Sequence, residues 1–244
     1  MIEAKNLHKA FGPVVAVDDV SFQAPDGSVT GLLGPNGAGK TTTLRILYSL
    51  LRPDRGVALI DGHNASTERE QVLKRMGVLS DNKGLYPRLT ARENIRYFGQ
   101  LYELPPAELE RRINDLISLL EMQEFADRRV EGFSQGQRTK VAIARALVHD
   151  PQNILLDEPT NGLDVMSTRA MRTFIRRLRD EGKCVLFSSH IMQEVSALCD
   201  QIIVIAQGKV SAQGTAEDLL RVTGQTNLED AFVAAIGSSE GLTL

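Results

Sequence analysis

The sequence predicts an α/β fold in which a parallel sheet is interrupted by a helical insertion. Three observations support this prediction. An apolar run at residues 29–33 leads into a glycine-rich loop and then a helical stretch at 41–51. Residues 90–149 have a helical pattern throughout, and beyond Asp150-Pro151 short apolar runs alternate with amphipathic stretches. Such alternation is typical of parallel strands joined by helical crossovers.

The first part of the chain is rich in β patterns. Short β-like runs occupy residues 2–7, 14–17, 20–23 and 57–60. Asp26-Gly27 has turn chemistry between two of the strands. Thr67 followed by Glu70 has the pattern of a capping box, which predicts a short helix that ends at Gly77.

The helical stretch begins at a second capping box, Thr90 with Glu93. One apolar stripe follows at helical spacing, formed by Leu109, Ile113, Leu116, Ile117 and Leu120. We interpret this stripe as core, with a partner site as the alternative.

Strands are expected again at residues 154–156, 185–187 and 202–205. One helix carries Met171, Phe174, Ile175 and Leu178 on a single face and ends at Gly182, and another covers 192–198. The tail from Thr226 is short, and we expect it to be partly mobile.

Composition limits the class of protein. The net charge of −3 argues against a nucleic-acid-binding protein with a basic surface, so no nucleic acid partner is expected. Cys184 and Cys199 have no metal-ligand spacing and are interpreted as buried thiols. No apolar run approaches the ~18 residues that cross a bilayer, and the N-terminus lacks a signal-peptide pattern. We therefore expect a cytoplasmic chain that reaches a membrane only through a partner.

The glycine-rich loop fits the phosphate-binding pattern G-x-x-x-x-G-K-[ST]. It consists of Gly34, Pro35, Asn36, Gly37, Ala38, Gly39, Lys40, Thr41 and Thr42. Glycines let backbone N–H groups turn inward, and the following helix start favours an anion. Lys40 can reach the β- and γ-phosphates, and the Thr41 hydroxyl can ligate Mg²⁺. The alternative is a turn without chemistry, but Lys and Thr at both required positions predict a nucleoside triphosphate site.

A buried strand at 154–156 ends in two acids, Asp157 and Glu158. Carboxylates at this edge of a sheet suit Mg²⁺ ligation beside a phosphate loop. We assign metal binding to Asp157, and we assign to Glu158 the polarisation of the attacking water as general base. The alternative is an acidic turn before Pro159.

Three further features allow two interpretations each. Ser134, Gly136 and Gln137 open a helix and form either a second anion site or a simple serine N-cap. As an anion site, the loop would serve the ATP of a second copy arranged head to tail. His190 follows a strand and is either a γ-phosphate contact or structural. Phe11 either stacks on a purine or belongs to the core.

Five motifs occur here in one order: the phosphate loop, Ser-Gln-Gly-Gln, Leu-Leu-Asp-Glu-Pro-Thr, Asn-Gly-Leu-Asp and Ser-Ser-His. With them, the chain resembles the ATP-binding subunit of an ATP-binding-cassette (ABC) transporter over nearly all of residues 1–214. The resemblance implies an α/β P-loop NTPase core with an antiparallel β subdomain and a helical insertion. It implies an ATPase with ATP and Mg²⁺ as cofactors.

Carried over by position, the resemblance makes Phe11 the adenine-stacking aromatic and residues 34–42 Walker A. It makes Asp157 and Glu158 the Walker B acid and the catalytic glutamate. Ser134, Gly136 and Gln137 become the signature loop, Asp164 part of the D-loop, and His190 the switch histidine that acts with Lys40 on the γ-phosphate.

Two positions depart from the family pattern. The third signature residue is Gln135, where glycine is usual. The Q-loop glutamine falls at Asp81, which is one methylene shorter and charged. Asp81 is therefore a candidate Mg²⁺ ligand, directly or through water, that adds negative charge near the phosphates.

A finer resemblance is to sodium-exporting cassettes of the NatA type among ABC-2 exporters. Three segments carry it, at 85–94, 189–200 and 227–230. The ABC family resemblance implies two cassettes, as homo- or heterodimer, and an integral membrane permease at the inner face of the cell membrane. It also implies that the helical insertion docks on the coupling helices of this permease. The alternatives are another cargo, such as a drug, lipid or polysaccharide, or a soluble non-transport ABC ATPase.

The same resemblance divides the chain. A single ATPase domain would span 1–214, with an α/β core at 1–83 and 150–214 and a helical subdomain at 84–149. Residues 215–244 would form a short C-terminal extension.

Overall fold

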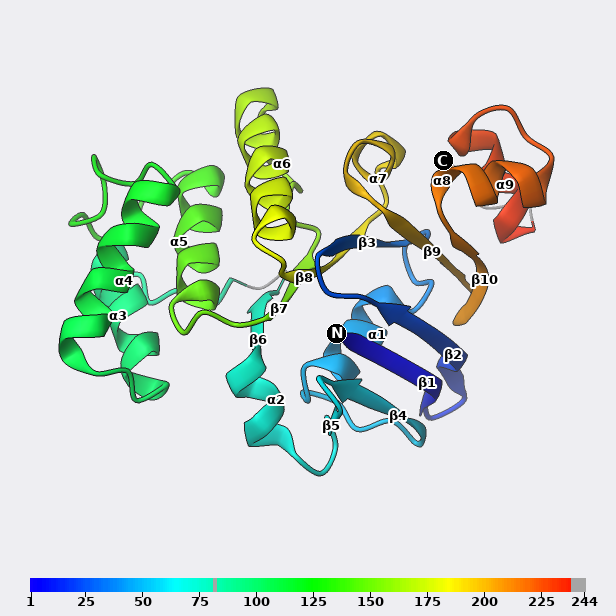
Figure 1. Ribbon diagram of the computed structural model, residues 1–244, viewed down its shortest axis with the longest axis horizontal. Coiled ribbons are helices and arrows are strands. Elements are labelled where there is room, and N and C mark those ends of the chain that lie inside the picture. The colour runs from blue at the N-terminus through cyan, green and yellow to red at the C-terminus, as the bar shows by residue number, and fades with distance from the viewer. Residues whose placement is uncertain (81–82, 238–244) are drawn as a thin grey trace.

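The computed structural model describes residues 1–80 and 83–237. Two sheets organise it (Figure 1). The larger sheet has the strand order β10-β9-β3-β8-β7-β6. Its strands are β3 (Ser28–Leu33), β6 (Met76–Leu79), β7 (Asn153–Asp157), β8 (Cys184–Ser189), β9 (Gln201–Ala206) and β10 (Lys209–Gly214). All neighbours run parallel except β9 and β10, which form a hairpin.

The smaller sheet is antiparallel and has the order β2-β1-β4-β5. Its strands are β1 (Ile2–Phe11), β2 (Val14–Ala24), β4 (Arg55–Ile60) and β5 (His63–Asn64). The two β-like runs expected between residues 14 and 23 are one strand, because Asp19 takes a positive φ of 60° and the pairing with β1 shifts register without ending.

Helix α1 (Lys40–Leu47) packs against strands of both sheets and joins them. Its residues Leu44 and Leu47 belong to a buried cluster with Leu7 of β1 and Leu186 of β8. The phosphate loop is therefore held at the junction of two packed sheets, which fixes its position.

The helical insertion lies at one end of the molecule (Figure 1). It consists of α3 (Ala91–Leu101), α4 (Pro106–Leu119) and α5 (Gln135–Leu147). The expected stripe on α4 is buried, and it shares a cluster with α5 and with α6 (Val165–Asp180). The core interpretation of the stripe is confirmed.

Three smaller helices follow α6 in the chain: α7 (Met192–Leu198), α8 (Ala216–Thr223) and α9 (Leu228–Ile236). The tail was expected to be partly mobile from Thr226, but residues 228–236 form a helix capped by Asn227. Phe232 and Ile236 pack against the main core, which gives this segment the apolar contacts that order it.

One predicted helix start is wrong. Helix α2 (Arg69–Arg75) has Glu68, not Thr67, as its N-cap, because the Glu68 carboxylate binds back to His63 and the Asn64 N–H. The helix also ends before Gly77, which lies in β6. The capping box at Thr90 forms as predicted, with Thr90 and Glu93 bonded reciprocally.

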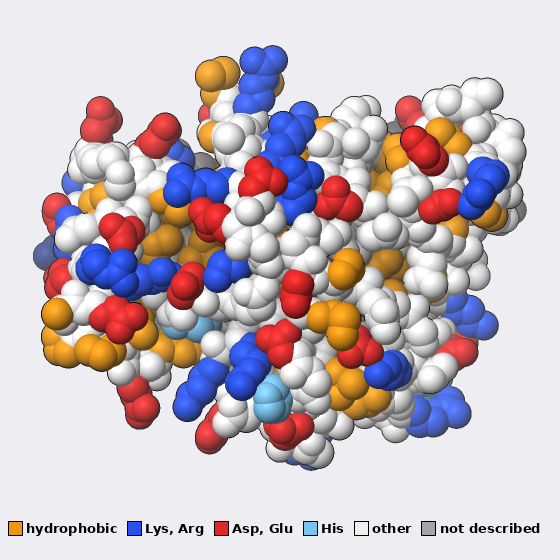
Figure 2. Space-filling model, viewed as in Figure 1, with side chains coloured by type: hydrophobic (Ala, Val, Ile, Leu, Met, Phe, Trp, Pro, Cys, Tyr) orange, Lys and Arg blue, Asp and Glu red, His pale blue; other side chains and the backbone are white. Residues whose placement is uncertain are grey.

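Acidic and basic side chains are interspersed over the face in Figure 2. Within residues 1–80 and 83–237, no helix has both the length and the apolar character that crossing a bilayer requires.

Candidate functional site

The phosphate loop leaves β3 at Gly34 and enters α1 at Lys40. A Cβ on Gly34 would lie 2.2 Å from the Ile205 carbonyl oxygen, so only glycine fits there. Gly39 has φ 105°, and a Cβ on it would lie 2.3 Å from the Ala16 carbonyl oxygen. The two glycines thus allow the tight wrap that turns the loop's N–H groups toward one point.

This loop forms one wall of a cavity of about 330 Å³. The cavity is lined by Ala16, Asn36, Gly37, Ala38, Gly39, Lys40, Thr41, Thr42, Asp157, Glu158, Asn161 and His190. The structure therefore brings together the loop, both acids and the histidine, which are far apart in the sequence.

The side chain of Lys40 is buried at the base of the cavity. Its ammonium donates to the carbonyl oxygens of Gly34 at 2.7 Å and Pro35 at 3.1 Å. Burial lowers the pKa of Lys40, and the charges of Glu158 and Asp157 oppose that shift. The arrangement concentrates one positive charge where an anionic group would bind.

Asp157 and Glu158 stand at the end of β7, held by the hydroxyl of Ser188 on the neighbouring strand β8. The Ser188 hydroxyl donates to Asp157 Oδ1 at 2.6 Å and accepts from the Glu158 N–H at 3.0 Å. Glu158 has a positive φ of 48°, a sparsely populated conformation for this residue type. Its Oε2 lies 3.0 Å from His190 Nδ1.

The donors at this edge suit Mg²⁺, which prefers oxygen ligands and uses few from protein. Thr41 offers a hydroxyl and Asp157 a buried carboxylate in the same cavity. Across residues 1–80 and 83–237, no cluster of three or more His, Cys, Asp or Glu could hold a metal unaided. Asp81, the third candidate ligand, lies outside the described residues.

Ser134, Gly136 and Gln137 line a different cavity, of about 350 Å³, together with Asp164. Ser134 caps α5 in a reciprocal capping box with Gln137. Asp164 caps α6, and the hydrogen bond from the Ser167 N–H lowers its pKa. This cavity and the phosphate cavity have no lining residue in common.

Phe11 ends β1 and is 49% exposed, so the core interpretation of this ring is wrong. The Lys9 ammonium lies 5.6 Å from the ring centroid. The exposed face leaves room for a flat partner to stack.

Three residues of the site were not found from the sequence: Ser188, Asn161 and Ala16. Ser188 belongs to the Ser-Ser-His motif, in which the sequence assigns a role only to His190. Its position beside β7 depends on the strand order, which local patterns do not specify. Ala16 lines the cavity from β2, and alanine carries no chemical signal in the sequence.

A protein-family model described as "ABC transporter" matches residues 17–161. The chain belongs to the ABC transporter family. The protein "ABC transporter ATP-binding protein NatA" of Bacillus subtilis (strain 168) is 49% identical over 91% of this chain and 91% of its own length. The "Linearmycin resistance ATP-binding protein LnrL" of the same strain is 35% identical over 98% of this chain and 79% of its own.

Solved structures of ABC transporter subunits have the same fold as this chain. "Structure of ATP binding subunit of ABC transporter" has a TM-score of 0.89 and 29% identity, and covers 96% of this chain and 99% of its own. The dimeric MJ0796 cassette has a TM-score of 0.80 and 27% identity, over 88% of this chain and 98% of its own. The chain is an ATP-binding and ATP-hydrolysing subunit of an ABC transporter with the P-loop NTPase fold.

Proposed function

We propose that this ATPase drives export of sodium ions through a separate integral membrane subunit. The observation that carries the proposal is the likeness to NatA, which extends over nearly the whole of both chains. The segments at 85–94 and 189–200 carry the same subtype resemblance. The LnrL relative, named for linearmycin resistance, supports a drug as the second candidate cargo.

We infer that two cassettes complete each ATP site. Lys40 and His190 line one cavity, whereas Ser134 and Gly136 line another. A head-to-tail pair would place the second cavity of one copy over the phosphate cavity of the other. The dimeric structure of the MJ0796 relative supports a pair of cassettes. The second cassette is a copy of this chain or a related subunit.

Within such a site, each residue has a distinct role. The loop N–H groups and Lys40 would hold the phosphates, and Phe11 would stack on the adenine. Glu158 would accept the proton of the attacking water, since its carboxylate is fixed beside His190 at 3.0 Å. His190 would then contact the γ-phosphate. Thr41 and Asp157, with Asp81 as a further candidate, would hold Mg²⁺, which neutralises phosphate charge when bound.

Signature and D-loop residues would complete the transition-state contacts across the dimer. The N–H groups at the start of α5, beside Ser134 and Gly136, point from a helix N-terminus and favour an anion. Gln137 holds the Ser134 backbone through its side chain at 3.0 Å. Asp164 fixes the start of α6 on the same cavity.

The helical subdomain at 84–149 would dock on the coupling helices of the membrane subunit. Tyr86, Tyr97 and Leu101 are exposed apolar side chains on this part of the chain, and the two tyrosine rings meet edge to face at 5.3 Å. Such exposed aromatic groups are typical of interfaces. The ATPase would comprise residues 1–214, with 215–244 as an extension, and lie at the inner face of the cell membrane.

Transport assays test the proposal. Vesicles containing both subunits should show ATP-dependent sodium flux that is lost in Glu158→Gln. If flux is absent while ATP hydrolysis is intact, sodium is rejected as cargo. Flux of a drug, lipid or polysaccharide in the same vesicles would then identify the exported class.

A further inference from the structure

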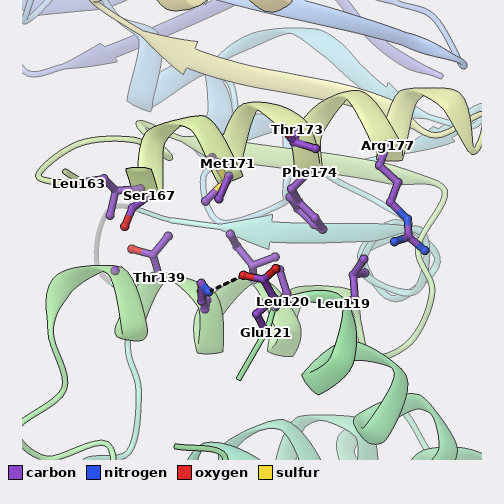
Figure 3. A pocket seen from close by; sticks show the side chains of 14 residues that line it. Leu119, Leu120, Glu121, Thr139, Leu163, Ser167, Met171, Thr173, Phe174 and Arg177 are labelled. Carbon is purple, nitrogen blue, oxygen red and sulfur yellow. Dashed lines mark ion pairs between the residues drawn. The ribbon is translucent and has the colours of Figure 1, made fainter. Parts of the chain in front are cut away.

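A third cavity, of about 350 Å³, lies between the helical insertion and the α/β core. Figure 3 shows it between α6 on one side and α5 with the end of α4 on the other. Helix α5 contributes Gly136, Thr139, Lys140 and Ile143, and α6 contributes Ser167, Ala170, Met171, Thr173, Phe174 and Arg177. Both sets follow helical spacing, so two helix faces oppose each other across the space.

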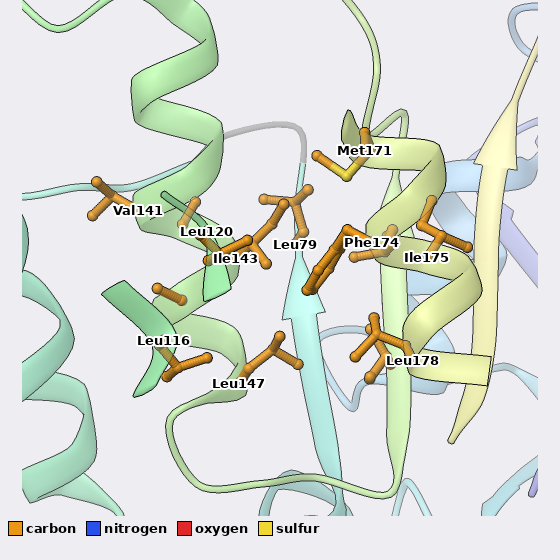
Figure 4. Packing of buried hydrophobic residues seen from close by; sticks show 14 of the residues in the cluster. Leu79, Leu116, Leu120, Val141, Ile143, Leu147, Met171, Phe174, Ile175 and Leu178 are labelled. Carbon is orange, nitrogen blue, oxygen red and sulfur yellow. The ribbon is translucent and has the colours of Figure 1, made fainter. Parts of the chain in front are cut away.

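The shape follows from the packing of these helices. A Cβ on Gly136 would lie 3.4 Å from Ser167 Oγ, so α5 and α6 approach closely at this end. Toward the C-terminal end of α6, the space is lined by Arg177 and by Leu119 of α4. Ile143 and Phe174, drawn in Figure 4, form the apolar wall beneath and belong to the main core. The cavity is therefore a built feature of the core edge.

The cavity is lined by a half-buried lysine whose acidic partner is exposed and distant. The Lys140 side chain is 29% exposed, and its acidic partner, Glu121, is 83% exposed and 3.9 Å away. The dashed line in Figure 3 marks this pair. Exposed pairs at such a distance contribute little, so an incoming anion can replace Glu121 at small cost. Arg177 also lines the space, but its guanidinium is paired with Glu181 at 2.9 Å, so Lys140 is the cation that an anion would meet.

We propose that this cavity binds a small amphiphile with an apolar chain and one anionic head, of the acyl carboxylate class. The chain would lie against the wall formed by Ile143 and Phe174, and the carboxylate would replace Glu121 at Lys140. The volume is in the range of small-molecule sites, which are apolar with a few polar groups that orient the ligand. A cationic amphiphile would meet Lys140 unfavourably.

The position gives such a ligand a route to the ATPase. Gly136, Lys140, Leu163 and Ser167 line both this cavity and the one around Ser134. An occupant would contact residues next to the signature loop without entering the phosphate cavity. Binding itself is measured without nucleotide, so the inference fails or holds independently of the proposed function.

Titration calorimetry with decanoate, on the full chain and below the micelle concentration, tests the site. Wild type should bind saturably, and uncharged decanol should bind about tenfold more weakly. The affinity of Lys140→Gln for decanoate should also be about tenfold lower, because the substitution removes the charged partner of the head group. Lys74→Gln, the matched control at an exposed position on α2, should bind as wild type. Ala170→Phe should abolish binding, since its ring occupies the cavity.

Non-saturable uptake, or equal affinity in wild type and Lys140→Gln, would overturn the proposal. So would equal losses in Lys140→Gln and Lys74→Gln, which would indicate a general charge effect. Thermal unfolding checks the fold of each variant. If Ala170→Phe does not fold, the decanol comparison and the two lysine variants decide.

Discussion

Ser188 links the two acids of the site, and Ser188→Ala tests whether that link serves hydrolysis. The hydroxyl is buried, donates to Asp157 at 2.6 Å and accepts from the Glu158 N–H at 3.0 Å. The bond to the charged carboxylate accounts for roughly 2 kcal/mol and the bond from the backbone for about 1 kcal/mol. The free energy of unfolding should therefore fall by about 3 kcal/mol. The turnover number should fall by about 10- to 100-fold, because the acids lose their fixed positions.

Ser189→Ala is the matched control. Its hydroxyl is also buried, donates to Glu194 at 3.0 Å and accepts from the Ile191 N–H at 3.0 Å, away from both acids. Denaturant unfolding and steady-state ATP hydrolysis should be measured on both variants. Both should lose similar stability, and only Ser188→Ala should lose turnover. An unchanged turnover number in Ser188→Ala, or an equal loss in the control, would refute the positioning role.

Three further predictions follow from the geometry. Gly39→Ala should unfold at much lower denaturant than Gly37→Ala, because only the first places a Cβ against backbone, at 2.3 Å; equal midpoints would contradict this. Burial lowers the pKa of His149 to about 4, so the unfolded state takes up its proton first and stability falls as pH drops from about 6.5 toward 4. His149→Phe should reduce the loss between pH 7 and 5 by about 1–2 kcal/mol in denaturant titrations, and an unaltered pH profile would exclude this residue as the cause. Lys40→Ala and Ser134→Arg should each be inactive alone, yet a mixture should regain partial ATP hydrolysis, since one shared site keeps both intact halves; a fully inactive mixture would argue against sharing.

Local chemistry predicted much of the fold. The strand, loop and helix around Lys40 follow from residue types alone, and Thr90 caps its helix as its pattern predicts. Ser134 also caps a helix, which is one of the two interpretations of its motif. The predicted N-cap at Thr67 is wrong because Glu68 bonds to His63 and to the Asn64 N–H. Both partners lie outside the segment from Thr67 to Glu70 on which the capping-box prediction is based.

Tertiary packing decided the rest. The helix from Leu228 to Ile236 is ordered by contact with a core assembled from distant segments, so the tail alone could not predict it. Ser188 could not be assigned a role before β8 was placed beside β7. The sequence allows Phe11 to stack on a purine or to belong to the core, and only the exposure of the ring at the end of its strand excludes the core.

The central claim is that this ATPase works on a membrane partner, and the most direct test is capture with Glu158→Gln. This variant keeps the loop that binds ATP and loses the general base, which should lower turnover by about 10²–10⁴-fold and trap the closed dimer. The tagged variant should be purified from gently solubilised membranes of the source cells with ATP present. We predict that a polytopic membrane protein copurifies with it. Ribosomes, DNA or no membrane protein in the eluate would contradict the transporter assignment.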